Sequence, residues 1–347
     1  MKALLLAGGK GTRLKPLTNN LPKPMVPILG IPLLKRTLLN LKQYGIDDII
    51  LSICYKPTEI FSYFGDGRDL GIKITYVEED IPLGTGGAIK NAEIYLDDTF
   101  LVLNSDIVSD INFGNILKYH KIKHAFATIA LTPVPDPTQY GVVELNNGYI
   151  TSFKEKPKAD EVTSNLINAG IYVFEPEIFN EIPDNMVVSI EKDIYPVLIE
   201  NGNKLAGFCD SFYWMDIGTP EKYMQVHYDI LDHKYRVNTP MQNIFYDVEF
   251  SESLSVSAGS KIIQPVSIGK NVNIASNAVV GPYAVIGDNV KIGPGTSISN
   301  SIVWNNVTVG KSTSINNTIV GSNCEIGNTK TICDSVFVKG SEEPMAI

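Results

Sequence analysis

The N-terminal segment 4–27 gathers residues that are typical of phosphate binding. An apolar run ends at Ala7, and Gly8, Gly9 and Gly11 follow it. Such a run indicates a central parallel strand, and glycines directly after a strand let backbone N–H groups approach a ligand, most often phosphate. The loop lacks the third glycine of a dinucleotide fingerprint and the Gly-Lys-Ser/Thr of a P-loop. It therefore predicts a phosphate-binding loop of another class.

Two cations strengthen this interpretation. Arg13 offers a planar fork of donors, and Lys23 lies between Pro22 and Pro24, whose rings restrict the backbone around it. The glycines alone would also suit an ordinary strand-to-helix turn. With both cations converging on one anion, we expect a bound nucleoside triphosphate.

Two aspartates stand at the ends of predicted strands. Asp106 directly follows the apolar run 100–103, and Asp216 ends an aromatic segment that leads through Gly218 into a Thr-Pro turn. Carboxylates in such positions bind Mg²⁺, although each alone would also suit a turn or a helix cap. As a pair they favour a metal site.

These segments together resemble the signature of sugar-1-phosphate nucleotidyltransferases, the enzymes that make nucleotide sugars, and the resemblance covers nearly the whole chain. It implies that Asp106 and Asp216 hold Mg²⁺ and that Lys156, in a Glu-Lys-Pro turn, binds the sugar phosphate. Residues 140–142 and 168–172 match two further family segments that meet the sugar.

The resemblance assigns three sets of residues. The expected catalytic residues are Arg13, Lys23, Asp106, Lys156 and Asp216. The expected nucleotide-binding residues are Leu6, Ala7, Gly8, Gly9, Gly11, Thr12, Arg13, Lys23, Glu79, Gly84 and Thr85. The expected sugar-phosphate-binding residues are Gly141, Glu155, Lys156, Asn168 and Gly170.

Residues 78–88 resemble the loop that binds the base. A carboxylate at Glu79 accepts from the N–H and NH₂ groups of guanine, whereas thymine or uracil favours an amide, so GTP is the expected nucleotide. A solvated acidic loop edge is the alternative. Mannose 1-phosphate is the expected sugar. Glucose 1-phosphate with dTTP, UTP or ATP, and heptose 1-phosphate with GTP, are the other substrate pairs.

The periodicity predicts two domains, 1–237 and 238–347. In the first, short apolar strands alternate with helical patterns, as in a Rossmann-like, doubly wound mixed α/β sheet. Strands are expected at 49–53, 73–77, 100–103, 127–131 and 149–154, and a helix is expected over 32–44. In such sheets ligands bind at the carboxyl ends of the strands.

The second domain repeats with a period of six. Apolar residues recur in pairs, beginning with Val266 and Ile268 and continuing to Cys324 and Ile326, and one residue is lost after Trp304. This pattern predicts a left-handed parallel β-helix, whose open ends favour a homo-oligomer, a dimer or a tetramer.

Composition excludes several classes of protein. The 347 residues carry a formal charge of −9, which disfavours nucleic acid or an anionic membrane as the partner. No apolar run is long enough to span a bilayer and the N-terminus lacks a signal-peptide layout, so we expect a cytoplasmic protein. The four cysteines lack metal or disulfide spacing.

Two other functions agree with parts of the sequence. An acyltransferase is common among hexapeptide β-helices, but all four histidines precede the repeats, which leaves such a site without its usual base. A non-catalytic nucleotide-sugar sensor would keep the fold, but such proteins typically lose parts of the glycine loop and of the Lys-Pro element, and both are intact here.

Overall fold

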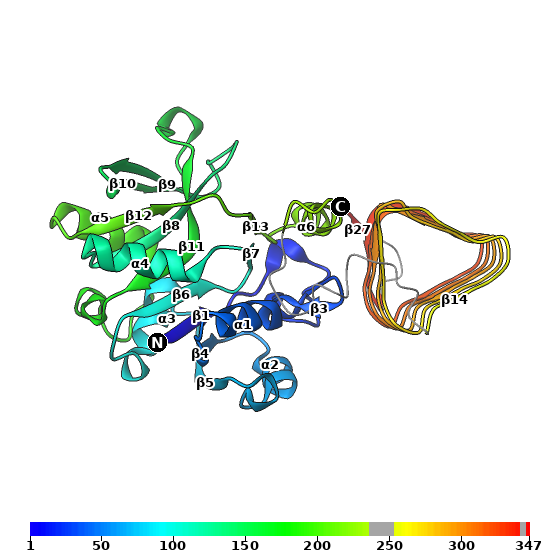
Figure 1. The fold of residues 1–347 in the computed structure, drawn as a ribbon, viewed down its shortest axis with the longest axis horizontal. Helices are drawn as coiled ribbons and strands as arrows, with labels where there is room; N and C mark the ends of the chain where they lie inside the picture. Colours follow the sequence, from blue (N-terminus) through cyan, green and yellow to red (C-terminus); the bar gives the residue numbers. More distant parts are fainter. Residues whose placement is uncertain (236–252, 341–344) are drawn as a thin grey trace. The chain divides into compact units, whose positions relative to one another are not determined.

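The computed structural model describes residues 1–235, 253–340 and 345–347 (Figure 1). The chain divides into two compact units. The first consists of residues 1–10 and 37–214, and the second of residues 11–36 and 215–347. The boundary expected between 237 and 238 lies outside the described residues. No helix in the described ranges has both the length and the apolar character needed to cross a membrane.

The first unit is built on a mixed sheet. Its strands lie in the order β5 (Lys73–Glu78), β4 (Asp48–Ile53), β1 (Lys2–Leu6), β6 (Phe100–Asn104), β11 (Leu166–Phe174), β8 (Ala127–Pro133), β12 (Leu205–Cys209), β10 (Tyr149–Glu155) and β9 (Gly141–Asn146). β5, β4, β1 and β6 run parallel, and β11 pairs antiparallel with both β6 and β8. The predicted strands and the mixed α/β class are confirmed.

Both faces of the parallel part of the sheet are buried. Leu4 and Val102 lie in one core cluster, and Leu5 and Leu103, which point to the other face, are buried too. This two-sided burial is why the central strands are continuously apolar rather than alternating. Helix α3 (Gly84–Asn91) packs against β1, and α4 (Phe113–Lys123) packs against β8, β11 and β12.

The remaining helices connect or cover the strands. They are α1 (Leu33–Gln43), α2 (Pro57–Phe64), α5 (Tyr195–Glu200) and α6 (Pro220–Leu231), and a π-helix, η7 (Ile190–Ile194), leads directly into α5. α1 confirms the helix predicted over 32–44. Short strands and 3₁₀ turns complete these connections: η1 (Thr12–Leu14), η2 (Lys23–Met25), β2 (Pro27–Ile28), β3 (Ile31–Pro32), η3 (Arg68–Leu70), η4 (Glu93–Tyr95), β7 (Ile107–Ser109), η5 (Ala159–Glu161), η6 (Pro176–Glu181) and β13 (Trp214–Asp216).

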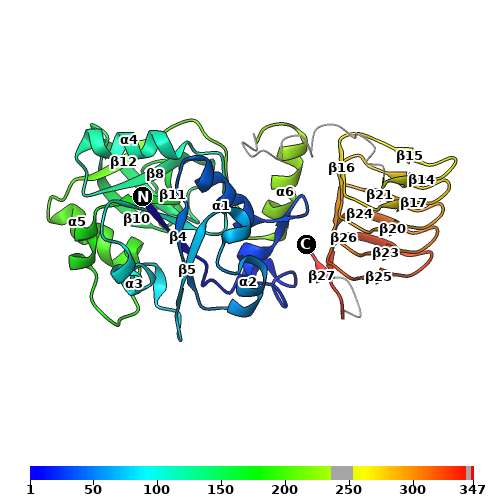
Figure 2. The ribbon, with the colours of Figure 1, turned by 60° about the horizontal axis from the view of Figure 1, so that its bottom comes forward.

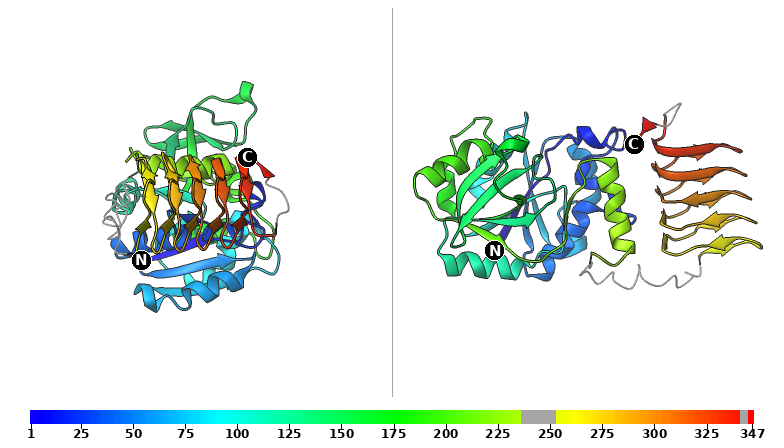
Figure 3. Two further views of the ribbon diagram at one scale, coloured as in Figure 1. Left: turned by 90° about the vertical axis from the view of Figure 1, so that its right-hand side faces the viewer. Right: turned by 90° about the horizontal axis from the view of Figure 1, so that it is seen from above.

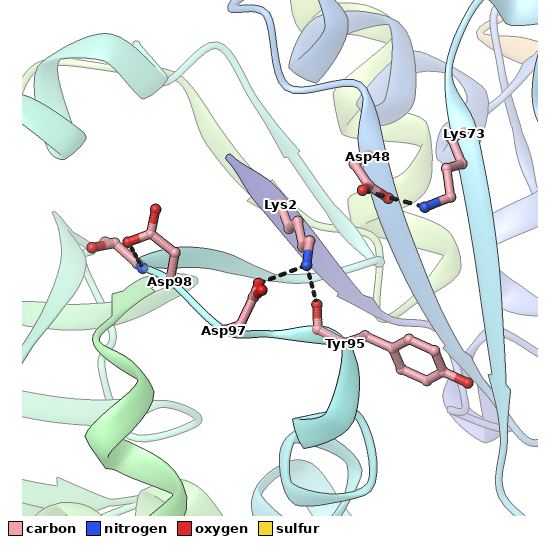
Figure 4. Close-up of polar contacts among 7 residues, drawn as sticks. Lys2, Asp48, Lys73, Tyr95, Asp97 and Asp98 are labelled. Carbon is pink, nitrogen blue, oxygen red and sulfur yellow. Dashed lines mark hydrogen bonds and ion pairs between the residues drawn. The ribbon is translucent and has the colours of Figure 1, made fainter.

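The two edges of the parallel strands differ in chemistry. At the amino-terminal edge, Lys2 Nζ donates to Tyr95 O and pairs with Asp97, both at 2.7 Å, and Lys73 pairs with Asp48 at 3.5 Å (Figure 4). These charges neutralise one another locally. Three of the predicted site residues, Gly8, Glu79 and Asp106, follow the opposite, carboxyl-terminal ends of β1, β5 and β6.

The C-terminal residues form a parallel β-helix, seen end-on as a triangle in Figure 1 and as stacked coils in Figures 2 and 3. Five coils are described. Their strands are β14 (Ser255–Val256), β15 (Lys261–Ile262), β16 (Val266–Ile268), β17 (Asn273–Ile274), β18 (Val279–Val280), β19 (Ala284–Ile286), β20 (Lys291–Ile292), β21 (Ser297–Ser299), β22 (Ser301–Val303), β23 (Thr308–Val309), β24 (Ser314–Val320), β25 (Glu325–Ile326) and β26 (Thr331–Phe337), with β27 (Met345–Ala346) antiparallel to β26. Their inward residues form one core.

The lost residue lies earlier than the sequence suggested. Val280 pairs with Ile298, eighteen positions on, whereas Ala284 pairs with Ser301, seventeen positions on. The slip therefore occurs at the corner around Asn300 rather than after Trp304. Asn300 takes a left-handed conformation (φ 47°), which asparagine tolerates, and closes a shorter corner than the Gly-Pro-Tyr corner of the preceding coil.

Candidate active site

The end of β1 is held by hydrogen bonds to the two neighbouring strand ends, those of β6 and β4. Ser105, at the end of β6, donates from Oγ to Leu6 O at 2.7 Å, and Ala7 N donates to Ser52 O at 2.8 Å. The chain is thereby held as it enters Gly8. Asp106 follows Ser105 directly and is half-buried. The sheet thus brings the start of the glycine loop and the first predicted metal ligand to one edge.

Gly8 leaves no room for a side chain. A Cβ atom there would lie 3.2 Å from Cys54 Cβ and 3.5 Å from a carboxylate oxygen of Glu79. Gly9 is exposed, and a Cβ there would meet nothing within 4 Å. The close approach at Gly8 and the open space at Gly9 suit a loop that presents backbone to a ligand.

Glu79 is buried and held from two sides. Its Oε1 accepts from Ser52 Oγ at 2.5 Å and its Oε2 from Leu83 N at 2.9 Å. This carboxylate therefore fixes the path of residues 80–83 as well as facing the glycine loop. Ser52 was not identified from the sequence, because a serine inside an apolar strand carries no motif.

The loop 83–87 closes against a distant segment. Gly84 has φ 75°, and Gly86 N donates to Val188 O at 2.8 Å. A Cβ at Gly84 would lie only 2.5 Å from Val188 O, so a side chain would force the two segments apart. Next to it, Thr85 Oγ1 donates to Glu191 at 2.5 Å and accepts from Ile190 N at 3.0 Å.

The predicted sugar-phosphate residues lie on β9, β10 and β11. A Cβ at Gly141 would lie 3.0 Å from Glu155, whose carboxylate stands 3.6 Å from Lys156 Nζ. Lys156 is exposed and has φ 49°, a left-handed turn that directs the chain away from β10. The exposed ammonium beside a half-buried carboxylate can take an anion on one side and a hydroxyl on the other.

The other two predicted sugar-phosphate residues, Asn168 and Gly170, lie at a bulge in β11. The pairing of β11 with β8 shifts between Asn168 and Tyr172, where Gly170 has φ 70°. Asn168 donates to Tyr172 Oη at 2.8 Å and accepts from Gly170 N at 2.9 Å. A Cβ at Gly170 would meet the side chain of Asn104, two residues before Asp106, at 2.7 Å. The sugar segment and the end of β6 are therefore neighbours.

The second unit holds the cations of the glycine loop. Gly11 has φ 59°, and a Cβ there would lie 3.0 Å from Lys23 Cβ. Lys23 lies in η2 and is 8% exposed, whereas Thr12 and Arg13 in η1 are exposed. The burial of Lys23 between two prolines, whose rings restrict the backbone, limits where its charge can act.

Asp216 lies in the same unit at the end of β13. Its carboxylate is buried and accepts from Gly218 N at 3.0 Å and from Lys222 Nζ at 2.5 Å. A Cβ at Gly218 would stand 3.2 Å from Arg13 Nη2, so Arg13 and Asp216 both border this glycine. The Thr-Pro turn after Gly218 opens α6, whose N-cap is Thr219.

Asp106 in the first unit and Asp216 in the second each carry carboxylate oxygens, the kind of ligand that a hard divalent cation prefers. Within residues 1–235, 253–340 and 345–347, no group of three or more His, Cys, Asp or Glu side chains is arranged to hold a metal ion.

Each unit contains part of the predicted set. The first collects Leu6, Ala7, Gly8, Gly9, Glu79, Gly84, Thr85, Asp106, Gly141, Glu155, Lys156, Asn168 and Gly170, and the second collects Gly11, Thr12, Arg13, Lys23 and Asp216. Two residues that the sequence did not identify, Ser52 and Glu191, hold members of the first set. Tyr172, in the predicted segment 168–172, holds Asn168.

Comparison with known proteins identifies the family of this chain. The nucleotidyl transferase family matches residues 2–233, and the GMPPB C-terminal domain matches residues 262–342. A mannose-1-phosphate guanylyltransferase of Mycobacterium tuberculosis is 34% identical over 87% of this chain and 79% of its own length. A UTP–glucose-1-phosphate uridylyltransferase of Synechocystis is 34% identical over 88% of this chain and 83% of its own length.

Two solved structures resemble about two thirds of this chain. HddC from Yersinia pseudotuberculosis, in complex with GMP-PN, is 31% identical, with a TM-score of 0.57 over 66% of this chain and 99% of its own. A putative glucose-1-phosphate thymidylyltransferase from Bacillus anthracis is 26% identical, with a TM-score of 0.61 over 66% of this chain and 94% of its own.

Proposed function

Because this chain belongs to the nucleotidyl transferase family and is a sugar-1-phosphate nucleotidyltransferase, we propose that it transfers a guanylyl group from GTP to mannose 1-phosphate, giving GDP-mannose and pyrophosphate. The observation that carries this choice is the name shared by relatives from four kinds of organism. Proteins of Mycobacterium, rice, Dictyostelium and Arabidopsis, 34–40% identical to this chain, are called mannose-1-phosphate guanylyltransferases.

The reaction needs two anions to meet. An oxygen of the sugar phosphate attacks the α-phosphorus, the α–β bridge breaks, and pyrophosphate leaves with the electron pair. The nucleophile is already anionic, so this chain's part is to position both substrates and to stabilise charge. No general base is required.

We assign the residues accordingly. Backbone N–H groups after Ala7 meet the triphosphate, Arg13 and Lys23 hold its charge, and Lys156 binds the sugar phosphate. Glu155 accepts hydrogen bonds from sugar hydroxyls, and Asn168 can accept from them or donate to them.

The family generally uses a divalent metal. We propose Mg²⁺, held by Asp106 and Asp216. Once bound, it would neutralise phosphate charge and orient the substrate oxygens.

A matrix of nucleotides against sugar phosphates, scored by pyrophosphate release, tests the substrates. We expect GTP with mannose 1-phosphate to give the highest kcat/KM. UTP with glucose 1-phosphate is the second candidate, because the Synechocystis relative bears that name. A higher value for any other pair would overturn the assignment of base or sugar. Release with no pair would favour a nucleotide-sugar sensor.

We further propose a cytoplasmic homo-oligomer. The support is the β-helix, whose flat walls and terminal coils are surfaces on which copies can stack. Light scattering of the purified chain measures its mass, and a monomeric mass at micromolar concentration would contradict the proposal.

A further inference from the structure

We propose that Glu191 is a positioning residue that fixes, through one carboxylate, both the base-binding loop and the sugar-binding bulge. The inference rests on the proposed function for the roles of those two segments. The hydrogen bonds themselves are properties of the first unit. Glu191 lies in η7, which no sequence motif singled out.

The first arm reaches the base-binding loop. Glu191 Oε2 accepts from Thr85 Oγ1 at 2.5 Å and from Ser189 Oγ at 2.8 Å. Thr85 also accepts from Ile190 N, so its hydroxyl is used in both directions by the η7 segment. Thr85 stands in the first turn of α3, directly after Gly84. Glu191 therefore determines where that turn begins.

The second arm reaches the bulge of β11. Glu191 Oε1 accepts from Tyr172 Oη at 3.4 Å, and Tyr172 Oη accepts from Asn168 Nδ2 at 2.8 Å. Tyr172 is fully buried, so its ring cannot turn aside to find another partner. The orientation of the Asn168 amide, which the proposed function places against the sugar, thus depends on Glu191 through one tyrosine.

Charge extends the same influence to Glu155. Burial and then the charge of Glu191 raise the pKa of Glu155, while Lys156 and Lys192 lower it. Removing the Glu191 charge therefore moves the Glu155 pKa down. A carboxylate that is bonded to the nucleotide side and acts electrostatically on the sugar side couples the two subsites.

Variants that remove one of the two hydrogen bonds at a time, Glu191–Thr85 (the first arm) or Glu191–Tyr172 (the second arm), test the proposal. Thr85→Val removes the first arm and Tyr172→Phe the second, whereas Glu191→Ala removes both. In steady-state pyrophosphate release we expect Thr85→Val to raise the nucleotide KM, Tyr172→Phe the sugar-phosphate KM, and Glu191→Ala both, each by about tenfold, the scale of one hydrogen bond to a charged group. We expect the kcat of the Glu191→Ala enzyme to stay within about threefold. A Glu191→Ala enzyme with neither KM raised, or only one, would overturn the proposal.

Amide hydrogen exchange on the substrate-free protein separates this inference from the proposed function. We expect Glu191→Ala to speed exchange at residues 84–90 and 168–172 together, with no change in Glu200→Gln, an exposed carboxylate of α5. If the wild-type chain released no pyrophosphate, the proposed function would be refuted, whereas hydrogen exchange would still test the positioning role of Glu191. If Glu191→Ala does not fold, Glu191→Gln takes its place and is expected to shift the acid limb of the sugar-phosphate kcat/KM profile to lower pH; an unmoved limb and unchanged exchange would refute the role.

Discussion

Replacing Asp216 by asparagine removes a carboxylate charge and keeps the shape of the side chain. The asparagine oxygen can still accept from Gly218 N, which is 3.0 Å from Asp216 Oδ1. Its NH₂ group, however, then faces the Lys222 ammonium, donor against donor. The variant therefore keeps the turn into α6 and loses the charge that the proposed Mg²⁺ site needs.

The expected losses differ in size between activity and stability. We expect kcat/KM to fall by about 10²–10³, or about 3–4 kcal/mol, the scale for one pre-organised electrostatic partner. Losing the charge-assisted bond from Lys222 should cost about 1–3 kcal/mol of unfolding free energy. The second loss alone leaves the protein folded, so the two effects can be measured separately.

Pyrophosphate release over a Mg²⁺ titration, with urea unfolding, is the assay. Lys222→Met is the matched control, because it breaks the same ion pair and keeps the carboxylate. We expect the control to share the stability loss and to retain most of the turnover, while Asp216→Asn also raises the Mg²⁺ concentration for half-maximal rate. Turnover and Mg²⁺ requirement close to wild type in Asp216→Asn would refute the metal assignment, as would equal losses of turnover in both variants.

Lys23→Ala and Asp106→Asn should each lower kcat/KM by about 10²–10³ in the same assay, whereas Asp97→Asn, an exposed change at the amino-terminal edge, should leave it unchanged; equal rates in all three would contradict both roles. Lys156→Ala should raise the sugar-phosphate KM by about 10–100-fold, the scale of a charged hydrogen bond, and an unchanged KM would argue against it as the phosphate ligand. Burial lowers the pKa of His227 to about 4, against about 6.5 in an unfolded chain. The unfolded state then binds more protons between these values, so stability is full above about pH 6.5 and falls by up to about 3 kcal/mol toward about pH 4. Urea unfolding at about pH 6.5 and at about pH 4 measures this loss of unfolding free energy. The same loss in His227→Gln would show that another group causes it.

The apolar periodicity of the sequence was sufficient to predict the fold class, because each strand, helix and coil has its own characteristic spacing of apolar residues. The buried strands β4 and β6 are continuous apolar runs, and α1 shows a helical spacing of leucines. In the β-helix, inward residues such as Ile274 and Ile292 recur at the period of one coil. The slip at Asn300 was misplaced, because a corner of one residue fewer changes the register without changing the apolar pattern on either side.

The hydrogen-bond partners of the side chains could not be predicted from the sequence, because the chain topology determines which distant residues meet. Thr85 and Glu191 are 106 positions apart and meet only because loop 83–87 closes on the segment 188–190. Ser52 finds Glu79 through the pairing of β4 with β5, which places the two strand ends side by side. Neither contact follows from residue type, since serine, threonine and glutamate are common on surfaces.

Glu79 shows how such contacts can bear on the choice of base. A mobile surface carboxylate can rotate to accept from many donors and discriminates weakly. Glu79 is buried, and Ser52 and Leu83 each fix one of its oxygens. It therefore cannot turn away from a base that offers an acceptor, and such a base would leave a buried charge facing a lone pair. Sites that hold a fixed polar group reject a mismatched partner far more strongly than sites built on apolar contact. Under the proposed function, selectivity for guanine then depends as much on Ser52 and Leu83, which hold the carboxylate still, as on Glu79 itself.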